Sequence, residues 1–119
     1  MKVKRGDVVL LDHPFSDASG SKVRPALVVQ ADVRNARLTD TIVVLITKNL
    51  KYVATDGTQV FIELTTTDGK ASGLKVDSAA KCGNLYTVHE DNIQKRIGNL
   101  SAAMMLQIDN GLKVALELP

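Results

Sequence analysis

The sequence predicts a small, mainly β domain with one closing helix, either a mostly antiparallel barrel or an α+β fold. Short runs of apolar, often β-branched residues recur along the chain, and clusters of turn-forming residues separate them. Only the C-terminal segment repeats its apolar residues with the period of a helix. Because 119 residues leave room for one core, we expect residues 1–119 to form a single domain.

The first half of the chain contains the expected central strands. Residues 8–11 predict a first strand, and residues 13–23, rich in Pro, Ser, Asp and Gly, predict a loop that faces a ligand. Residues 25–30 and 41–47 are nearly continuous apolar runs, which are typical of strands buried on both faces. Between these two runs, residues 31–40 predict a polar linker.

The second half adds edge strands and the helix. After a long connection, four further segments predict strands: residues 59–65, 78–82, 84–89 and 94–98. The first of these alternates apolar and polar residues, as in a strand covered on one side, and Gly83 separates the second from the third. Ser101 is a good N-cap for a helix whose apolar residues follow at steps of three and four: Ala102, Met105, Ile108, Leu112, Ala115 and Leu116.

Composition excludes several classes of protein. With 45% hydrophobic and 24% charged residues, wholesale disorder is not expected. No apolar run approaches the roughly 18 residues that cross a bilayer, and the N-terminus does not resemble a signal peptide, so we expect a cytoplasmic location. The single Cys82 cannot close an intramolecular disulfide, and with only two histidines beside it the sequence predicts no structural zinc site.

The distribution of charge is more informative than its total of +2. Residues 1–51 hold nine Lys or Arg against five Asp, a net charge of +4, whereas residues 52–119 hold six against eight acidic residues, a net charge of −2. The four aromatic residues are too few and too scattered to predict the stacking platforms of many single-strand binders.

Several segments, taken in their order and spacing, carry a family resemblance. They are Gly6-Asp7-Val8-Val9-Leu10, Phe15, Ser19-Gly20-Ser21-Lys22, Arg24-Pro25-Ala26-Leu27-Val28-Val29, Thr41-Ile42-Val43-Val44 with Ile46-Thr47, Gly73-Leu74-Lys75-Val76-Asp77-Ser78, Tyr86-Thr87-Val88 and Lys95-Arg96-Ile97-Gly98-Asn99-Leu100. Over nearly its whole length the chain thus resembles the MazF/PemK family of toxin–antitoxin ribonucleases.

The resemblance implies both a fold and an activity. The fold would be an SH3-like barrel of the PemK/CcdB type with a C-terminal amphipathic helix. The activity would be sequence-specific cleavage of single-stranded mRNA by the 2′-hydroxyl, without a metal or other cofactor. The implied partners are a second copy of the chain, a cognate antitoxin and, through the toxin–antitoxin complex, operator DNA. Met104 and Met105 beside Ile108 also suggest more apolar helix surface than one small domain covers.

Arg24 is the first candidate catalytic residue. Phosphodiester cleavage builds negative charge on the phosphoryl oxygens, and a guanidinium supplies planar, permanently charged donors. The family's essential arginine of an Arg-Pro pair matches Arg24-Pro25. From the residues alone the simpler interpretation is that Arg24 lies over the surface or pairs with an aspartate, and only the resemblance reverses it.

Three further residues are candidates for the chemistry. Thr47 matches the family's catalytic-site threonine, and its hydroxyl at a strand end can donate to phosphate or orient the attacking 2′-hydroxyl; strand propensity alone also explains a threonine there. Lys75 and Asp77 match a pair to which one family branch assigns acid and base work. Their alternate spacing puts both on one face if the segment is extended, but Asp77 is equally well explained as a structural turn residue.

Other polar residues divide between RNA contacts and structural roles. The candidate RNA-binding residues are Ser19, Lys22, Arg34, Lys48 and Lys51, and Arg37 belongs to the same basic loops, although an ordinary solvated charge cluster explains these loops about as well. We do not interpret His13 and His89 as a catalytic pair. The resemblance places the histidine of one family branch later in this loop, nearer Ala18, and His89 begins a polar turn. Cys82 is expected to be a small buried residue.

Two other functions share this fold or this partner. A gyrase poison of the CcdB type depends on terminal aromatic and polar residues, whereas this chain ends Val-Ala-Leu-Glu-Leu-Pro. A nucleic-acid-binding regulator that represses its own operon together with an antitoxin is the second alternative. Cleavage of RNA, with Arg24→Ala as a control, separates the three.

Overall fold

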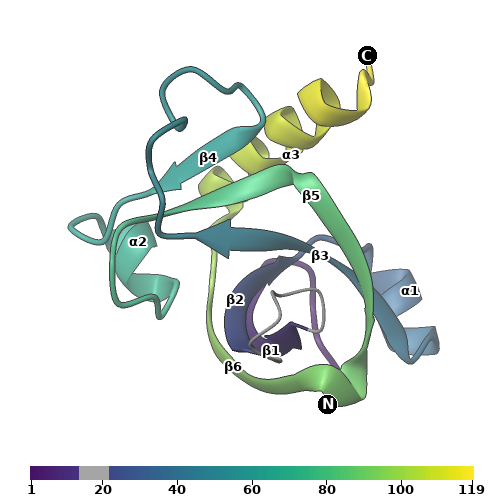
Figure 1. Cartoon of the computed structure of the whole chain (residues 1–119). Coiled ribbons are helices and arrows are strands. Elements are labelled where there is room, and N and C mark those ends of the chain that lie inside the picture. The colour runs from purple at the N-terminus through teal and green to yellow at the C-terminus, as the bar shows by residue number, and fades with distance from the viewer. Residues whose placement is uncertain (14–21) are drawn as a thin grey trace.

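The computed structural model describes residues 1–13 and 22–119, which form one curled antiparallel sheet with helices packed against it (Figure 1). The strands are β1 (Asp7–His13), β2 (Lys22–Val28), β3 (Asp40–Thr47), β4 (Gln59–Ile62), β5 (Ser78–His89) and β6 (Ile93–Asn99). Their order across the sheet is β4-β5-β3-β2-β1-β6, and every neighbouring pair is antiparallel. The predicted mainly β class is therefore confirmed.

The sheet curls strongly but its closure into a barrel is not shown. In Figure 1, β5 and β6 sweep around β1 and β2, and the turn that joins β5 to β6 lies at the bottom of the view. No pairing joins the two end strands, β4 and β6, in the part of the chain that the structure describes. The sequence predicted either a mostly antiparallel barrel or an α+β fold. The structure shows the antiparallel sheet and the packed helices that both share.

The helices are short except for the last. They are α1 (Asp32–Arg37), α2 (Thr67–Ala71), the single 3-10 turn η1 (Glu90–Asn92) and α3 (Ala102–Leu116). The predicted helix is confirmed as α3, and the Ser101 side chain accepts a hydrogen bond from the Met104 backbone N–H at 3.2 Å, as an N-cap should. The predicted polar linker over residues 31–40 contains the short helix α1, which the sequence analysis did not predict.

Two apolar clusters fill the two faces of the sheet. On one face, Val8, Leu27 and Val44 lie in adjacent strands and pack with α3 through Met104, Met105 and Ile108. A second cluster lies on the other face, inside the curl: Val3, Val9, Leu11, Ala26, Val28, Val43, Val88 and Ile93. The expectation that the central strands are buried on both faces is confirmed, since Ala26, Leu27 and Val28 have no exposed surface.

One expected pair of strands is a single bent strand. We expected residues 78–82 and 84–89 to be separated at Gly83, but β5 runs through that residue. On β3, Val44 pairs with Leu85 and the next residue, Leu45, pairs with Lys81, so three residues of β5 bulge out of the ladder between them. A bulge of this kind bends a strand without ending it, and β5 turns a corner in Figure 1.

The connection between β2 and β3 determines which residues can share a site. Since α1 joins the end of β2 to the start of β3, it marks one end of this antiparallel pair. The beginning of β2 and the end of β3 lie at the opposite end. Arg24 and Thr47 belong to that opposite end.

Candidate functional site

Arg24 and Thr47 lie on the same face of the sheet. The β2–β3 ladder pairs Ala26 with Leu45 as its last pair at this end, and Arg24 and Thr47 each stand two residues beyond that pair. Because side chains two residues apart in a strand point to the same side, Arg24 and Thr47 continue the face of Ala26 and Leu45. The sheet therefore brings the two principal predicted site residues together at one end.

Both side chains are available to a ligand. Arg24 is exposed, and its side chain makes no hydrogen bond or ion pair with another residue in the described ranges. The half-buried Thr47 accepts a hydrogen bond at Oγ1 from the backbone N–H of Asn49, at 3.1 Å. An oxygen that accepts in this way keeps its own hydrogen to donate. The site thus offers a fixed positive charge and an oriented hydroxyl donor.

The loop that carries Lys75 and Asp77 lies at the same end of the sheet. Thr47 pairs with Ala79, the second residue of β5, and this loop leads directly into β5. Lys75 and Asp77 do not share a strand face, because residues 75 and 76 form a bend and β5 begins only at Ser78. Asp77 Oδ1 accepts the backbone N–H of Leu64 at 2.8 Å, which ties the segment after β4 to the start of β5.

The predicted RNA-binding residues fall into three groups. Lys48 and Lys51 follow Thr47 and are exposed, and the Lys51 ammonium lies 5.4 Å from the centre of the Tyr52 ring. Lys22 begins β2, two residues before Arg24. Ser19 lies outside the described residues.

Arg34 and Arg37 form the third group and are separated from the site. Both lie on α1, at the opposite end of the β2–β3 pair from Arg24 and Thr47. The sequence analysis grouped them with Lys48 and Lys51 as candidate RNA-binding loops, but within one chain the fold places them at the other end of the sheet. Proximity in the sequence was misleading here. A segment that connects two antiparallel strands lies at one end of the pair, whereas Arg24 and Thr47 lie at the other end.

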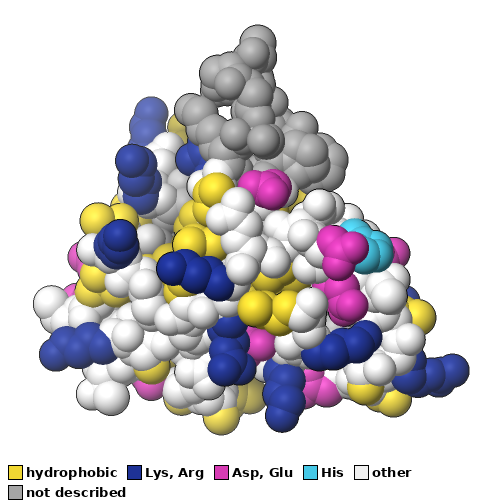
Figure 2. Space-filling model, turned by 90° about the horizontal axis from the view of Figure 1, so that it is seen from below, with side chains coloured by type: hydrophobic (Ala, Val, Ile, Leu, Met, Phe, Trp, Pro, Cys, Tyr) yellow, Lys and Arg dark blue, Asp and Glu magenta, His cyan; other side chains and the backbone are white. Residues whose placement is uncertain are grey.

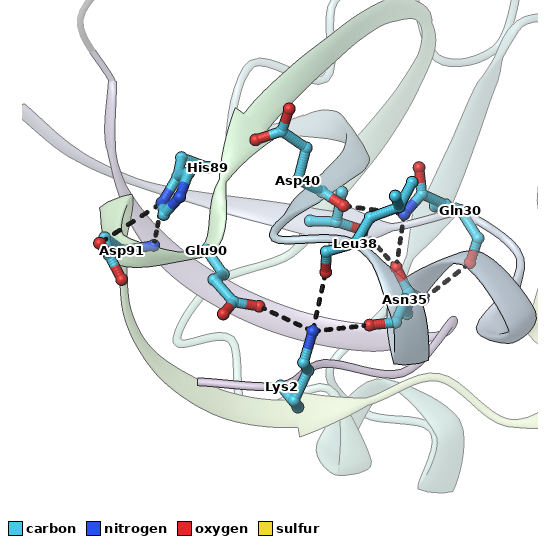
Figure 3. A network of polar contacts seen from close by, with 9 residues as sticks. Lys2, Gln30, Asn35, Leu38, Asp40, His89, Glu90 and Asp91 are labelled. Carbon is cyan, nitrogen blue, oxygen red and sulfur yellow. Dashed lines mark hydrogen bonds and ion pairs between the residues drawn. The ribbon is translucent and has the colours of Figure 1, made fainter.

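The α1 end of the sheet is occupied by a structural network of polar contacts (Figure 3). Buried Asn35 accepts from Thr41 Oγ1 at 2.7 Å and from Gln30 Nε2 at 2.9 Å. Lys2 Nζ donates to the backbone carbonyls of Leu38 at 2.8 Å and Asn35 at 3.2 Å. These polar groups serve as one another's hydrogen-bond partners, so a role in stabilising the fold is enough to explain why they gather here.

Neither His89 nor Cys82 belongs to the site. His89 ends β5 opposite Asp40, at the α1 end, and its Nδ1 accepts the backbone N–H of Asp91 at 3.0 Å, as Figure 3 shows. Cys82 has no exposed surface, and its burial, followed by the charge of Asp109, raises the pKa of its thiol to about 11. His13 closes β1.

No group of three or more His, Cys, Asp or Glu in the described ranges is arranged to hold a metal ion. On the face seen in Figure 2, the described Lys and Arg side chains are spread over the surface with Asp and Glu among them. No helix in residues 1–13 and 22–119 is long and apolar enough to span a membrane.

One residue at the site was not found from the sequence. Phe61 on β4 pairs with Ala79, and Ala79 pairs with Thr47, so the three stand in one row across the sheet. The scattered aromatic residues gave no sign of this placement. The alternation in residues 59–65 put Phe61 on the less covered face, but only the strand pairing shows what lies beside it.

The described residues form a small, mainly β protein that places a guanidinium and a hydroxyl donor at one end of a curled antiparallel sheet, with lysines in the adjoining loop, and such groups can bind phosphate. The family model described as the PemK-like, MazF-like toxin of type II toxin–antitoxin systems matches residues 4–116. The chain belongs to this family.

The chain is similar over its full length to proteins named as endoribonucleases. It is 33% identical to endoribonuclease MazF6 of Mycobacterium tuberculosis, over 99% of this chain and 100% of the relative. It is 32% identical to endoribonuclease EndoA of Bacillus subtilis, over 99% of this chain and 97% of the relative.

Solved structures show the same fold. An endoribonuclease from Mycobacterial species, solved in complex with its cognate antitoxin, superposes with a TM-score of 0.79 at 25% identity, covering 98% of this chain and 97% of the other. The Mycobacterium tuberculosis toxin MazF-mt6 has a TM-score of 0.76 at 21% identity, covering 95% and 98%.

Proposed function

We propose that the chain is a sequence-specific endoribonuclease toxin that cleaves single-stranded RNA, mRNA included, and is neutralised by a cognate antitoxin. The observation that carries the proposal is the common face and common sheet end of Arg24 and Thr47. The endoribonuclease names of its full-length relatives support the same activity.

The proposed chemistry uses the RNA's own nucleophile. The 2′-oxygen attacks the adjacent phosphorus while the bond from phosphorus to the 5′-oxygen of the next nucleotide breaks. The 2′-hydroxyl loses its proton and the leaving 5′-oxygen gains one, so the products are a 2′,3′-cyclic phosphate and a 5′-hydroxyl. DNA, which lacks the 2′-hydroxyl, is not a substrate.

Arg24 and Thr47 have separate roles in this step. The Arg24 guanidinium donates to the non-bridging oxygens, where charge increases in the transition state. The Thr47 hydroxyl, oriented by the Asn49 backbone, positions the phosphate or the attacking 2′-oxygen. Lys75 and Asp77 stand beside this end of the sheet; the bond from the Leu64 backbone gives Asp77 a structural role, and acid–base work by the Lys75–Asp77 pair is the alternative.

The test is cleavage of a long, defined RNA in the presence of a chelator, with the new 5′ ends mapped. We expect cleavage at a short recurring sequence, a loss of about 10²- to 10³-fold for Arg24→Ala, and a smaller loss for Thr47→Val. Arg37→Ala, at the far end of the sheet, is the matched control and should cleave normally.

Full activity of purified Arg24→Ala would overturn the mechanism. Gyrase inhibition without RNA cleavage, or operator binding alone, would replace the proposed function with one of its two alternatives.

The proposed assembly is a homodimer that binds an antitoxin. The antitoxin complex of the Mycobacterial structure supports that partner. We propose that an acidic, partly apolar segment of the antitoxin folds across Arg24 and the Lys48–Lys51 loop, where it would exclude RNA.

A further inference from the structure

An aromatic side chain stands on the polar face of the edge strand β4. Val60 and Ile62 point into the core, with 6% and 0% of their surface exposed, whereas Phe61 between them is 40% exposed. Gln59, which shares its face of β4 by alternation, is polar. Burial in the chain's own core therefore accounts for Val60 and Ile62 but not for a phenyl ring at position 61.

Strand pairing places this ring beside the proposed catalytic residues. Phe61 is opposite Ala79, and Ala79 is opposite Thr47, so only one small, fully buried side chain separates the ring from the site. Because neighbouring strands lie about 4.8 Å apart, the Phe61 and Thr47 backbones, two strands apart, are separated by roughly 10 Å. Extending the β2–β3 register two residues beyond its last pair places Arg24 one strand further along the same row.

Polar groups accompany the ring on its face. Gln59 and Lys81 are directly opposite each other in the next row of the ladder. The Gln59 amide is weakly held: its Nε2 contacts Asp56 at 3.5 Å, and no donor in the described ranges reaches its buried Oε1. An exposed aromatic ring with polar side chains in the neighbouring row is suited to a nucleobase, because the ring stacks on the face of the base.

We propose that Phe61 stacks on a nucleobase next to the scissile phosphate and is a substrate-positioning residue of the RNA site. This inference rests on the proposed ribonuclease function and deepens it. A base held on Phe61 fixes the neighbouring phosphate over the row formed by Ala79, Thr47 and Arg24. A nucleobase suits this place better than an apolar protein segment, because beyond the small side chain of Ala79 the row continues with the hydroxyl of Thr47 and the guanidinium of Arg24.

Binding of an uncleavable RNA tests the proposal. The probe is the RNA segment that the wild-type protein cuts, with a 2′-deoxynucleotide at the cleavage position. We expect Phe61→Ala and Phe61→Leu to weaken binding by about 5- to 100-fold, and Phe61→Tyr to restore it, because stacking needs a π-face and not only apolar bulk. Thermal melting of each variant checks that the fold is intact.

Fluorescence gives an independent measurement. The chain contains no tryptophan, so Phe61→Trp creates a single reporter whose emission should be quenched when the probe stacks on it. Val33→Trp is the matched control: Val33 is 68% exposed on α1, at the other end of the β2–β3 pair, and its emission should not change.

The outcomes separate the two proposals. If the wild-type protein cuts RNA but Phe61→Leu binds the probe as tightly as wild type, stacking is wrong and the ribonuclease function stands. If Phe61→Leu loses antitoxin binding while RNA binding is unchanged, Phe61 belongs to a protein interface and stacking is again wrong. If the wild-type protein neither cuts nor binds RNA, the proposed function fails and the stacking role with it.

Discussion

The hydrogen bond that Asp77 accepts favours a structural role for its carboxylate. Its Oδ1 accepts the Leu64 backbone N–H at 2.8 Å, and an asparagine can accept the same bond without being a base. We expect Asp77→Asn to keep both the melting temperature and the cleavage rate close to wild type. Asp77→Ala should lower the melting temperature. If Asp77→Asn keeps its fold but loses activity, the carboxylate does acid–base work instead.

Cys82 predicts a pH dependence of stability at the alkaline end. Burial raises the pKa of its thiol from 9.0 to about 11, so the native protein binds this proton more tightly than the unfolded chain does. Its stabilising contribution is complete below pH 9 and is lost as the pH rises from 9 toward 11. Urea unfolding across this range should show the decline, and Cys82→Ala should flatten it. The native thiol should also resist a thiol reagent at pH 8 and react once unfolded.

At the scale of elements, Gly98 shows where β6 meets the end of α2. A Cβ built on Gly98 would collide with the backbone of Ala71 and Ser72, so Gly98→Ala must push two chain segments apart. We expect a loss of about 1–3 kcal/mol in the free energy of unfolding, measured with urea. Gly83→Ala is the matched control, because its nearest neighbour would be Thr58 Oγ1 at 3.7 Å, an ordinary contact. Equal losses in both variants would contradict this account.

The elements that sequence could predict are those whose signal is local. Apolar runs and the Ser101 cap predicted the central strands and α3, because burial and capping depend on residues close together in the chain. The continuity of β5 through Gly83 could not be predicted, since it depends on β3 supplying a partner on both sides of the bulge. The short helix α1 was also missed; its buried Asn35 is held by Gln30 and by Thr41 of β3.

The same distinction holds for the site. The resemblance indicated Arg24 and Thr47, but their common face comes from the β2–β3 register. That register also separates Arg34 and Arg37 from them, and the β4–β5 pairing adds Phe61. Pairing between distant segments is the information that a single sequence does not display.

For the whole molecule, the surface available to a second copy differs from the one suggested by sequence. Met104, Met105 and Ile108 are buried in the chain's own core, so they do not provide it. The solvent face of α3 and the chain end instead expose Leu106, Val114, Leu116 and Leu118. We expect a homodimer through this face.

Sedimentation at micromolar concentration tests this. Leu106→Glu should shift the protein to a monomer without unfolding it, because Leu106 is 65% exposed. Val33→Glu is the matched control: Val33 on α1 is 68% exposed, and this variant should remain dimeric. A monomeric wild-type protein would contradict the prediction.

The antitoxin prediction belongs to the same scale, because it depends on which charges the fold brings together. Only part of the basic N-terminal half lies at the site: Arg24, Lys48 and Lys51 do, whereas Arg34 and Arg37 are at the far end of the β2–β3 pair. We expect an acidic antitoxin segment to bind with an affinity that falls as salt is added and to compete with the uncleavable RNA. Lys48→Ala and Lys51→Ala should each weaken the binding of both antitoxin and RNA, and should make both affinities less dependent on salt. Arg34→Ala and Arg37→Ala should change neither, since charges at the far end are largely screened. If antitoxin and RNA bind together without weakening each other, inhibition acts at a distance and not by occupying the RNA site.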